Sequence, residues 1–397
     1  MSRGWSRAEL ARALHRDPTK LYSDSGNPKL DFLVALAEAL EWPVGEVVAS
    51  VWGEDGSSRL NGEATIDDFQ SLDALTMDAH RAGDYSKMVD LSRRLFSIAD
   101  SPERRALACN REAGGWDGLG RYTKALDAVR RGLQQGQIST ELRLKLQGNL
   151  ANAYYTLWDL TSAMGVAEML VQWHRENPPD SPLRAQRAAF ARYVRGNAHR
   201  RLMDIEEERA DMHARMARVD LEASMHEYDR LAVELDDEAL AGIANTCRAG
   251  IIEVDVELGA ISPARAIEEL SAGLDNVIDL DAIGVGDWLE SYGWWCIFGG
   301  NIALRHLHGR QLQHALAVFT NKALEIADRL DNWAMRERVF SLQYALHEAM
   351  IMATDFEIDF TIDDEDRRLI AGTMGRFPRF RGVGWKILRT AKLVAAS

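Results

Sequence analysis

The sequence predicts an all-α protein in which a small N-terminal domain is followed by a long array of helical hairpins. Three observations lead to this fold class. Apolar residues recur with the period of a helix along most of the 397 residues, and strand-like runs are few. Corner motifs return at intervals of 37 to 56 residues. A polar, glycine-rich stretch at 53–65 indicates a linker between the first helices and the rest.

Composition limits the kinds of partner. The net charge of -14 opposes general adhesion to nucleic acid or to anionic membrane, so contact with DNA needs a local basic face. No apolar run is long enough to span a bilayer, and no signal-peptide core follows Met1, so we expect a cytoplasmic protein without a membrane partner. Cys109, Cys247 and Cys296 lie far apart and lack metal-ligand spacing. We expect them to be buried apolar residues, with a redox role as the alternative.

Residues 1–52 are predicted to form a small helical domain. Ser6 and Glu9 make a capping box for a first helix, and Asp17 caps a short second helix that begins with a proline. A third, amphipathic helix covers about 30–40, and Pro43 begins a fourth. The first twenty residues carry five basic side chains against two acidic ones, whereas the next 32 carry one against five. Basic residues therefore gather on the first two helices.

This order of helices, with Asn27-Pro28-Lys29-Leu30 before a Leu-Ala-x-Ala-Leu helix, resembles the Cro/phage-repressor (XRE-like) class of helix-turn-helix domains. The resemblance implies a positioning helix at Arg7–Leu14 and a recognition helix at Pro18–Asp24 that enters the major groove. The DNA-binding residues that it implies are Arg7, Arg12, Arg16, Thr19, Lys20, Tyr22, Ser23 and Lys29. The alternative is a helical module that binds protein through an ordinary charged face.

A hairpin pattern fills residues 66–354, and its clearest copy runs from Asn149 to Leu170. Its corners are Gly83-Asp84-Tyr85, Gly120-Arg121-Tyr122, Trp158-Asp159-Leu160, Met203-Asp204-Ile205, Gly259-Ala260-Ile261 and Gly309-Arg310-Gln311-Leu312. Three to five residues later comes a position where the next helix must pack closely, namely Met88, Ala125, Ala163, Ala266 and Ala315. The pattern resembles the tetratricopeptide repeat, which implies a right-handed helical-repeat solenoid.

Three asparagines follow a small residue at the same offset in the first helix of a unit. In tetratricopeptide repeats this position lines the concave groove and binds the backbone of an extended peptide. The resemblance therefore implies a ligand-binding groove with Asn152, Tyr155, Asn197 and Asn301. The alternative is that these asparagines only face water. Four tryptophans are expected in the core, with the wall of a ligand pocket as the alternative: Trp288, Trp294, Trp295 and Trp333.

Residues 355–397 are expected to be capping helices. An acidic stretch at 355–366 precedes a helix that we place from Arg367 to about Met374. Residues 376–397 carry six basic side chains and no acidic one. We expect Trp385, Ile387, Leu388, Ala391 and Leu393 to face inward and close the solenoid. The alternative is a second basic surface that meets DNA or a partner.

No motif in the sequence points to catalysis. A nucleophile elbow, a phosphate-binding glycine loop, a zinc helix and a paired-carboxylate motif are all missing from the sequence, so we expect no enzyme, no cofactor and no metal. A repressor-like head joined to repeats is similar to the peptide-responsive RRNPP regulators. The resemblance implies a homodimeric transcriptional regulator that binds double-stranded DNA and is modulated by a peptide or protein ligand in its groove. The alternative is a non-catalytic repeat adaptor whose N-terminal module contacts protein.

Overall fold

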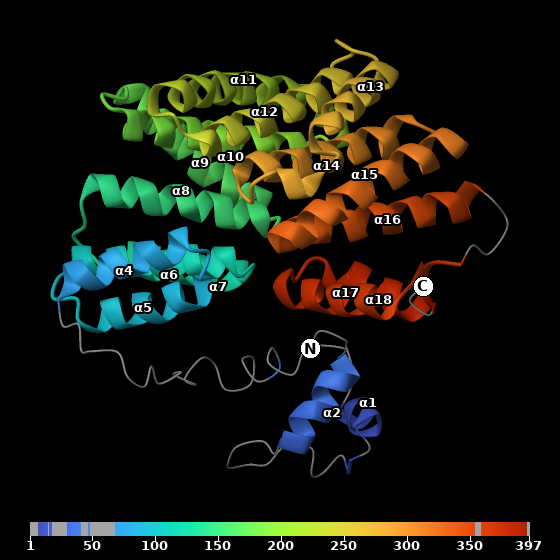
Figure 1. Cartoon of the computed structure of the whole chain (residues 1–397), viewed down its shortest axis with the longest axis horizontal. Coiled ribbons are helices and arrows are strands. Elements are labelled where there is room, and N and C mark those ends of the chain that lie inside the picture. The colour runs from blue at the N-terminus through green and yellow to red at the C-terminus, as the bar shows by residue number, and fades with distance from the viewer. Residues whose placement is uncertain are drawn as a thin grey trace. The chain divides into compact units, whose positions relative to one another are not determined.

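The structure, a computed structural model, describes residues 7–14, 16–17, 30–40, 47, 68–353 and 359–394. The described residues are almost entirely helical, which confirms the all-α prediction (Figure 1). The chain divides into two compact units, one made of Met1–Glu63 with His347–Ser397 and the other of Ala64–Leu346. Five residues expected at the DNA lie outside the described ranges: Thr19, Lys20, Tyr22, Ser23 and Lys29.

The second unit is a series of helices that pack mainly on their neighbours along the chain. These helices are α4 (Phe69–Arg81), α5 (Tyr85–Ser97), α6 (Pro102–Gly118), α7 (Tyr122–Leu133), α8 (Thr140–Thr156), α9 (Leu160–Glu176), α10 (Pro182–Leu202), α11 (Ala210–Leu235), α12 (Glu238–Glu257), α13 (Pro263–Gly273), α14 (Asp287–His306), α15 (Gly309–Leu330) and α16 (Trp333–Ala353). Short 3-10 turns lie at η2 (Glu207–Arg209), η3 (Leu274–Val277) and η4 (Leu280–Ala282). Figure 1 shows the hairpins side by side, from α4 in blue to α16 in orange-red.

Tight corners join the helices where the sequence places them. The backbone φ is positive at Gly83, Gly120, Gly259 and Gly309, and also at Trp158, where φ is 65°. Glycine adopts this left-handed conformation freely because it has no Cβ, whereas for a tryptophan it is strained. The packing positions predicted to follow the corners are all buried, namely Met88, Ala125, Ala163, Ala266 and Ala315. Five of the six predicted corners are therefore confirmed, and at 203–205 the chain passes from α10 to α11 through η2 instead.

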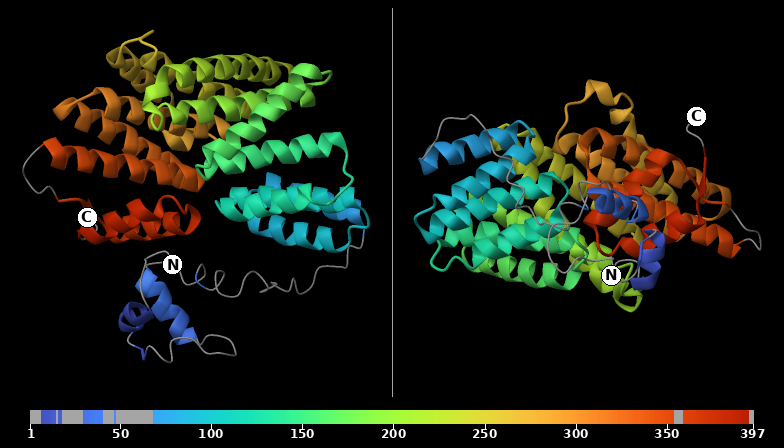
Figure 2. Two further views of the ribbon diagram at one scale, coloured as in Figure 1. Left: turned by 180° about the vertical axis from the view of Figure 1, so that it is seen from behind. Right: turned by 90° about the horizontal axis from the view of Figure 1, so that it is seen from below.

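Early and late helices of the second unit touch each other. A Cβ atom added at Gly120 would come within 2.7 Å of the Trp333 ring. The indole nitrogen of Trp158 donates to a carboxylate oxygen of Glu337 over 3.3 Å, and the guanidinium of Arg338 lies 4.6 Å from the centre of the Trp158 ring. Figures 1 and 2 both show the green end of α8 beside the start of α16. The array of hairpins therefore brings its early and late helices into contact.

Within the first unit, α1 (Arg7–Ala13) and α2 (Leu30–Leu40) share a small apolar core. Its buried residues are Ala11, Leu14, Phe32, Leu33, Ala37 and Val47. Arg7 is the first residue of α1, and Arg12, on the same helix, is exposed. The guanidinium of Arg16 lies over the Phe32 ring, with its carbon 5.1 Å from the ring centre.

The C-terminal residues form α17 (Asp364–Arg376), α18 (Arg381–Thr390) and a short parallel pair, β1 (Thr361–Ile362) with β2 (Lys392–Leu393). Helix α17 begins three residues earlier than predicted, because Asp363 and Asp366 form a capping box at its start. Trp385 and Ile387 are buried, as predicted. The prediction for Leu393 was wrong, since the helix ends at Thr390 and Leu393, in the strand that follows, is 57% exposed.

Two further expectations concern single features. Cys109, Cys247 and Cys296 are free thiols and buried, as the sequence indicates. None of the described helices combines the length and the apolar character that crossing a bilayer requires.

Candidate ligand chamber

A hollow of about 580 Å³ lies inside the closed part of the second unit. Its walls come from helices far apart in the sequence, including α4, α6, α8, α10 and α14. Binding sites for small ligands span roughly 300–1,000 Å³, so this chamber has a suitable size. Asn152 and Tyr155, two of the residues expected to bind a ligand, both line it.

The two residues on α8 are placed well for recognition. Asn152 is half-buried, and its side-chain amide makes no hydrogen bond with any residue that the structure describes. Tyr155 is one helical turn further along and only 9% exposed. An amide with an unused donor and an unused acceptor matches a peptide bond, which offers one of each.

Asn197 does not face the chamber, which corrects the sequence-based prediction. It is 2% exposed, donates to the backbone oxygen of Tyr193 over 3.0 Å and accepts from Arg200 over 3.1 Å. The cause is the position of α10, which packs against α8, α9, α11 and α12 and is covered on most of its surface. The Asn197 amide is therefore used within the protein.

Asn301 lies apart from the chamber. Its amide donates to Glu253 over 3.2 Å and accepts from Arg338 over 3.4 Å. It lines a separate hollow of about 530 Å³ and a small cavity between that hollow and the chamber. The structure thus brings Asn152 and Tyr155 together and separates them from Asn301.

Three carboxylates that the sequence did not single out stand in the chamber wall: Asp117, Asp287 and Glu290. One oxygen of Glu290 accepts hydrogen bonds from the Trp294 indole and the Asn332 amide, each over 3.0 Å. Burial, followed by the charges of Asp287 and Asp117, raises the pKa of Glu290 to about 7. Asp117 is exposed to the chamber, yet the protein around the chamber raises the pKa of its carboxyl to about 6.

Aromatic rings form much of the remaining wall, including Tyr85, Phe190, Tyr193 and Trp294. Trp294 is one of the four tryptophans for which a pocket wall was the alternative to the core. Burial raises the pKa of Tyr193 well above its usual value, so its hydroxyl stays protonated at neutral pH. Ring faces attract cations, and this attraction adds to that of the carboxylates.

Arg201 forms a cationic part of the wall. Its guanidinium lies between two rings, 3.8 Å from the centre of Tyr155 and 4.2 Å from that of Trp158. One terminal nitrogen donates to the backbone oxygen of Tyr155 over 2.7 Å. Burial lowers the pKa of Arg201 to about 10, with a further contribution from Arg338 and Arg200, so the side chain remains charged at neutral pH.

A buried ion-pair network fixes the helices that carry these walls. Glu253 on α12 is fully buried and accepts from Arg200 on α10 and from Arg305 on α14, each over 2.6 Å. Arg305 also lies 2.8 Å from Asp204 and 3.4 Å from Glu257. The network therefore ties three helices together.

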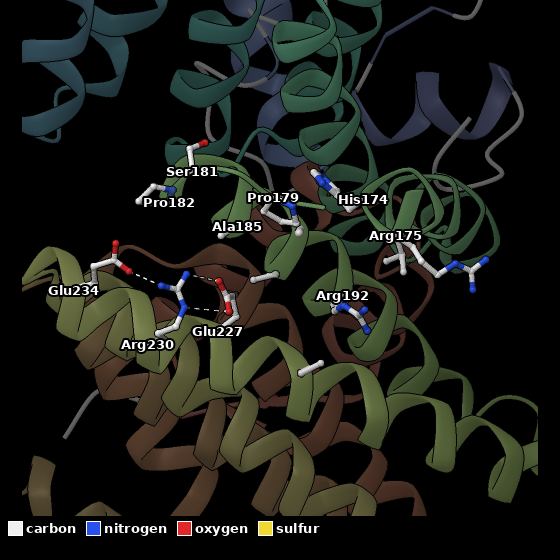
Figure 3. A pocket seen from close by; sticks show the side chains of 14 residues that line it. His174, Arg175, Pro179, Ser181, Pro182, Ala185, Arg192, Glu227, Arg230 and Glu234 are labelled. Atoms are coloured by element: carbon white, nitrogen blue, oxygen red, sulfur yellow. Dashed lines mark hydrogen bonds and ion pairs between the residues drawn. The ribbon is translucent and has the colours of Figure 1, made fainter. Parts of the chain in front are cut away.

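A second pocket of about 570 Å³ lies on α9, α10 and α11 (Figure 3). Alanines form much of its lining, and Arg230 is held between Glu227 and Glu234. The Nδ1 atom of His174 is buried without a partner among the described residues. Because the charges in this pocket largely neutralise each other, the chamber is the stronger candidate site.

The structure shows no group of three or more metal-ligating side chains within the ranges it describes. No protein-family model matches the chain, and no curated protein sequence matches it either. The chemistry of the chamber and the pattern of the N-terminal helices are therefore the basis for the proposal below.

Proposed function

We propose that the protein is a DNA-binding transcriptional regulator whose tetratricopeptide-like solenoid binds a peptide or protein ligand that modulates DNA binding. The observation that carries this proposal is the chamber in the helix array, with the unused amide of Asn152 in its wall. A hollow of this kind suits a receptor, because it can surround a ligand and respond to its presence.

The N-terminal helices support the DNA-binding part. Helices α1 and α2 pack through a compact apolar core, which leaves Arg12 exposed on the helix that the helix-turn-helix resemblance assigns to positioning. The first twenty residues also carry five basic side chains against two acidic ones, a local excess of positive charge on an acidic protein that supports contact with DNA.

In the mechanism that we propose, a homodimer presents two heads to successive turns of the major groove. Ligand in the chamber stabilises one arrangement of the chains over another and so changes the affinity for DNA. The effect on DNA binding is limited by the difference in ligand affinity between the two arrangements.

Selection of genomic DNA fragments by the full chain tests the proposal. We expect retention at low salt that falls steeply as salt rises, because phosphate contacts release counterions. The double variant Arg12→Ala with Lys20→Ala should bind more weakly, and the slope of log affinity against log salt should fall by about 0.9 for each phosphate that the variant no longer neutralises.

The control is Arg389→Ala, which removes an exposed arginine from α18. We expect it to leave DNA retention unchanged, and a loss in this variant without a loss in the double variant would place the DNA surface in the C-terminal helices instead. If the wild-type chain retains no DNA at low salt, the regulator proposal fails, and a repeat adaptor with a protein partner is the remaining function.

A further inference from the structure

The guanidinium of Arg201 has an unfilled hydrogen-bonding edge. In this molecule the Nε and Nη2 atoms of Arg195 bind the carboxylate of Asp220, each over 2.6 Å. The same atoms of Arg111 bind Asp73 over 2.8 and 3.1 Å. In Arg201 these two atoms have no partner among the described residues.

The empty edge of Arg201 belongs to a residue that is otherwise well covered. Arg201 is 7% exposed, the rings of Tyr155 and Trp158 lie against its guanidinium, and it lines the chamber. No carboxylate lies within ion-pair distance of Arg201 in the described part of the chain, and the charge of Glu337 acts on it only from further away. A planar carboxylate fits the two parallel N–H groups of this edge. The empty edge therefore matches a carboxylate that belongs to a ligand.

The chamber wall also holds carboxylates that make no ion pair with a residue that the structure describes. Asp117 and Asp287 make no side-chain hydrogen bond or ion pair within the described part of the chain, and one oxygen of Glu290 is unused. These carboxylates lie close enough for each aspartate to raise the pKa of Glu290. Tyr85 lies nearby, since the same three charges raise the pKa of its hydroxyl. A positively charged group would relieve this repulsion.

We propose that the chamber binds a linear peptide whose free C-terminal carboxylate occupies the Nε–Nη2 edge of Arg201 and whose ammonium or guanidinium group lies among Asp117, Asp287 and Glu290. This inference rests on the ligand-binding part of the proposed function and gives the ligand its chemistry and direction. The unused amide of Asn152 pairs with a peptide bond between the two charged ends.

The strained backbone at Trp158 is consistent with this role. Two of the earlier corners have glycine where Trp158 stands, with φ values of 70° and 66°. The centre of the Trp158 ring lies 4.2 Å from the guanidinium carbon of Arg201, so the strained residue supplies a ring beside this guanidinium that glycine could not.

Affinity selection from two synthetic hexapeptide libraries tests the inference. The libraries have the same randomised sequences and free N-termini, but one ends in a free carboxylate and the other in an amide. The full chain is incubated with each, and retained peptides are sequenced by mass spectrometry. We expect at least about tenfold greater retention from the free-acid library, equivalent to ~1.4 kcal/mol, and enrichment of arginine or lysine among retained peptides.

Variants assign each preference to its residues. Arg201→Gln should abolish the preference for the free acid while basic peptides remain enriched. Asp287→Asn should reduce the enrichment of basic peptides while the preference for the free acid remains. The matched control is Arg130→Gln, because Arg130 also lies over a ring, that of Tyr154, but is exposed and outside the chamber lining. Thermal unfolding of each variant identifies any that fail to fold, and Arg201→Lys, which keeps the charge without the edge, is then used instead.

Four results would overturn the inference. The first three are equal retention from both libraries, retention from neither, and retention without a preference for basic residues. The fourth is competition by free arginine as effective as that by retained peptides, which would show that the ligand is a single amino acid. DNA selection with the same preparation separates the two proposals. A chain that retains DNA but no peptide contradicts only this inference, whereas one that retains peptides but no DNA contradicts the proposed regulator.

Discussion

Replacing Glu253 by glutamine should destabilise the second unit strongly. This residue is fully buried and accepts from Arg200, Arg305 and Asn301. Glutamine has nearly the same shape, but it removes the negative charge and places an NH2 group against the guanidinium donors. Arg305 keeps Asp204 as a counter-ion, whereas Arg200, only 3% exposed, loses the one carboxylate with which it pairs in the described structure.

The expected magnitude follows from the burial of Arg200. Removing one partner of a buried ion pair destabilises a protein by about 3–5 kcal/mol, because the remaining charge is desolvated without compensation. For a protein unit of this size, a loss of 1 kcal/mol lowers the unfolding temperature by roughly 2–4 °C. We therefore expect the unfolding temperature of Glu253→Gln to fall by roughly 6–20 °C.

Glu257 gives a matched control, since it lies one turn further along the same helix and also pairs with Arg305. Its side chain is 25% exposed and its distance to Arg305 is 3.4 Å. Glu257→Gln should cost less than about 1 kcal/mol. Thermal unfolding followed by circular dichroism at neutral pH measures both variants. Equal shifts in the two, or a shift for Glu253→Gln of only a few degrees, would refute the reasoning.

Three further predictions concern packing and pH. Gly242→Ala should destabilise the folded protein by roughly 1–3 kcal/mol, because its Cβ would lie 2.5 Å from the backbone of Asp287. Gly165→Ala is the control, since a Cβ there meets nothing within 4 Å, and it should stabilise the protein by about 0.5–1 kcal/mol. Chemical denaturation measures the free energy of unfolding of both variants. Since the pKa of Glu290 is raised from 4.5 to about 7, the folded state holds its proton more tightly, so stability should fall as pH rises from about 4.5 to about 7. Glu290→Gln should flatten this decline in unfolding temperature, and an unchanged pH profile would contradict the assignment. Since burial lowers the pKa of His199 from 6.5 to about 4, it should contribute the opposite trend, a loss of stability as pH falls from about 6.5 to about 4 that His199→Gln removes.

The helices and corners were predictable because their causes are local. A glycine that must adopt positive φ, an aromatic or aliphatic residue after it and a small or flexible residue further on are all visible in the sequence, as at Gly83, Tyr85 and Met88. Asn152 and Tyr155 were singled out by the resemblance to the tetratricopeptide repeat, and their spacing on one helix explains why both line the chamber.

The charges of the chamber were not predictable from the sequence. Asp117, Arg201 and Glu290 come from α6, α10 and α14, and only the closure of the array brings them into one wall. The prediction that Asn197 lines the groove was wrong for a related reason. It rested on the position of Asn197 in the sequence pattern, which does not reveal that four other helices pack on α10. One signal was available: Trp158 stands where neighbouring corners have glycine, and such a departure from a local rule often marks a functional position.

Two contacts join the early and late helices: Gly120 packs against Trp333, and Trp158 donates a hydrogen bond to Glu337. They limit which insertions and deletions of hairpins the protein tolerates. An open row of repeats can lengthen or shorten by one unit, since each unit depends only on its neighbours. Here an inserted or deleted hairpin between residues 120 and 333 would separate Gly120 from Trp333 and Trp158 from Glu337, and the chamber would lose its shape. The number of hairpins between residues 120 and 333 is therefore fixed by geometry, and variation in length should be confined to segments outside that interval.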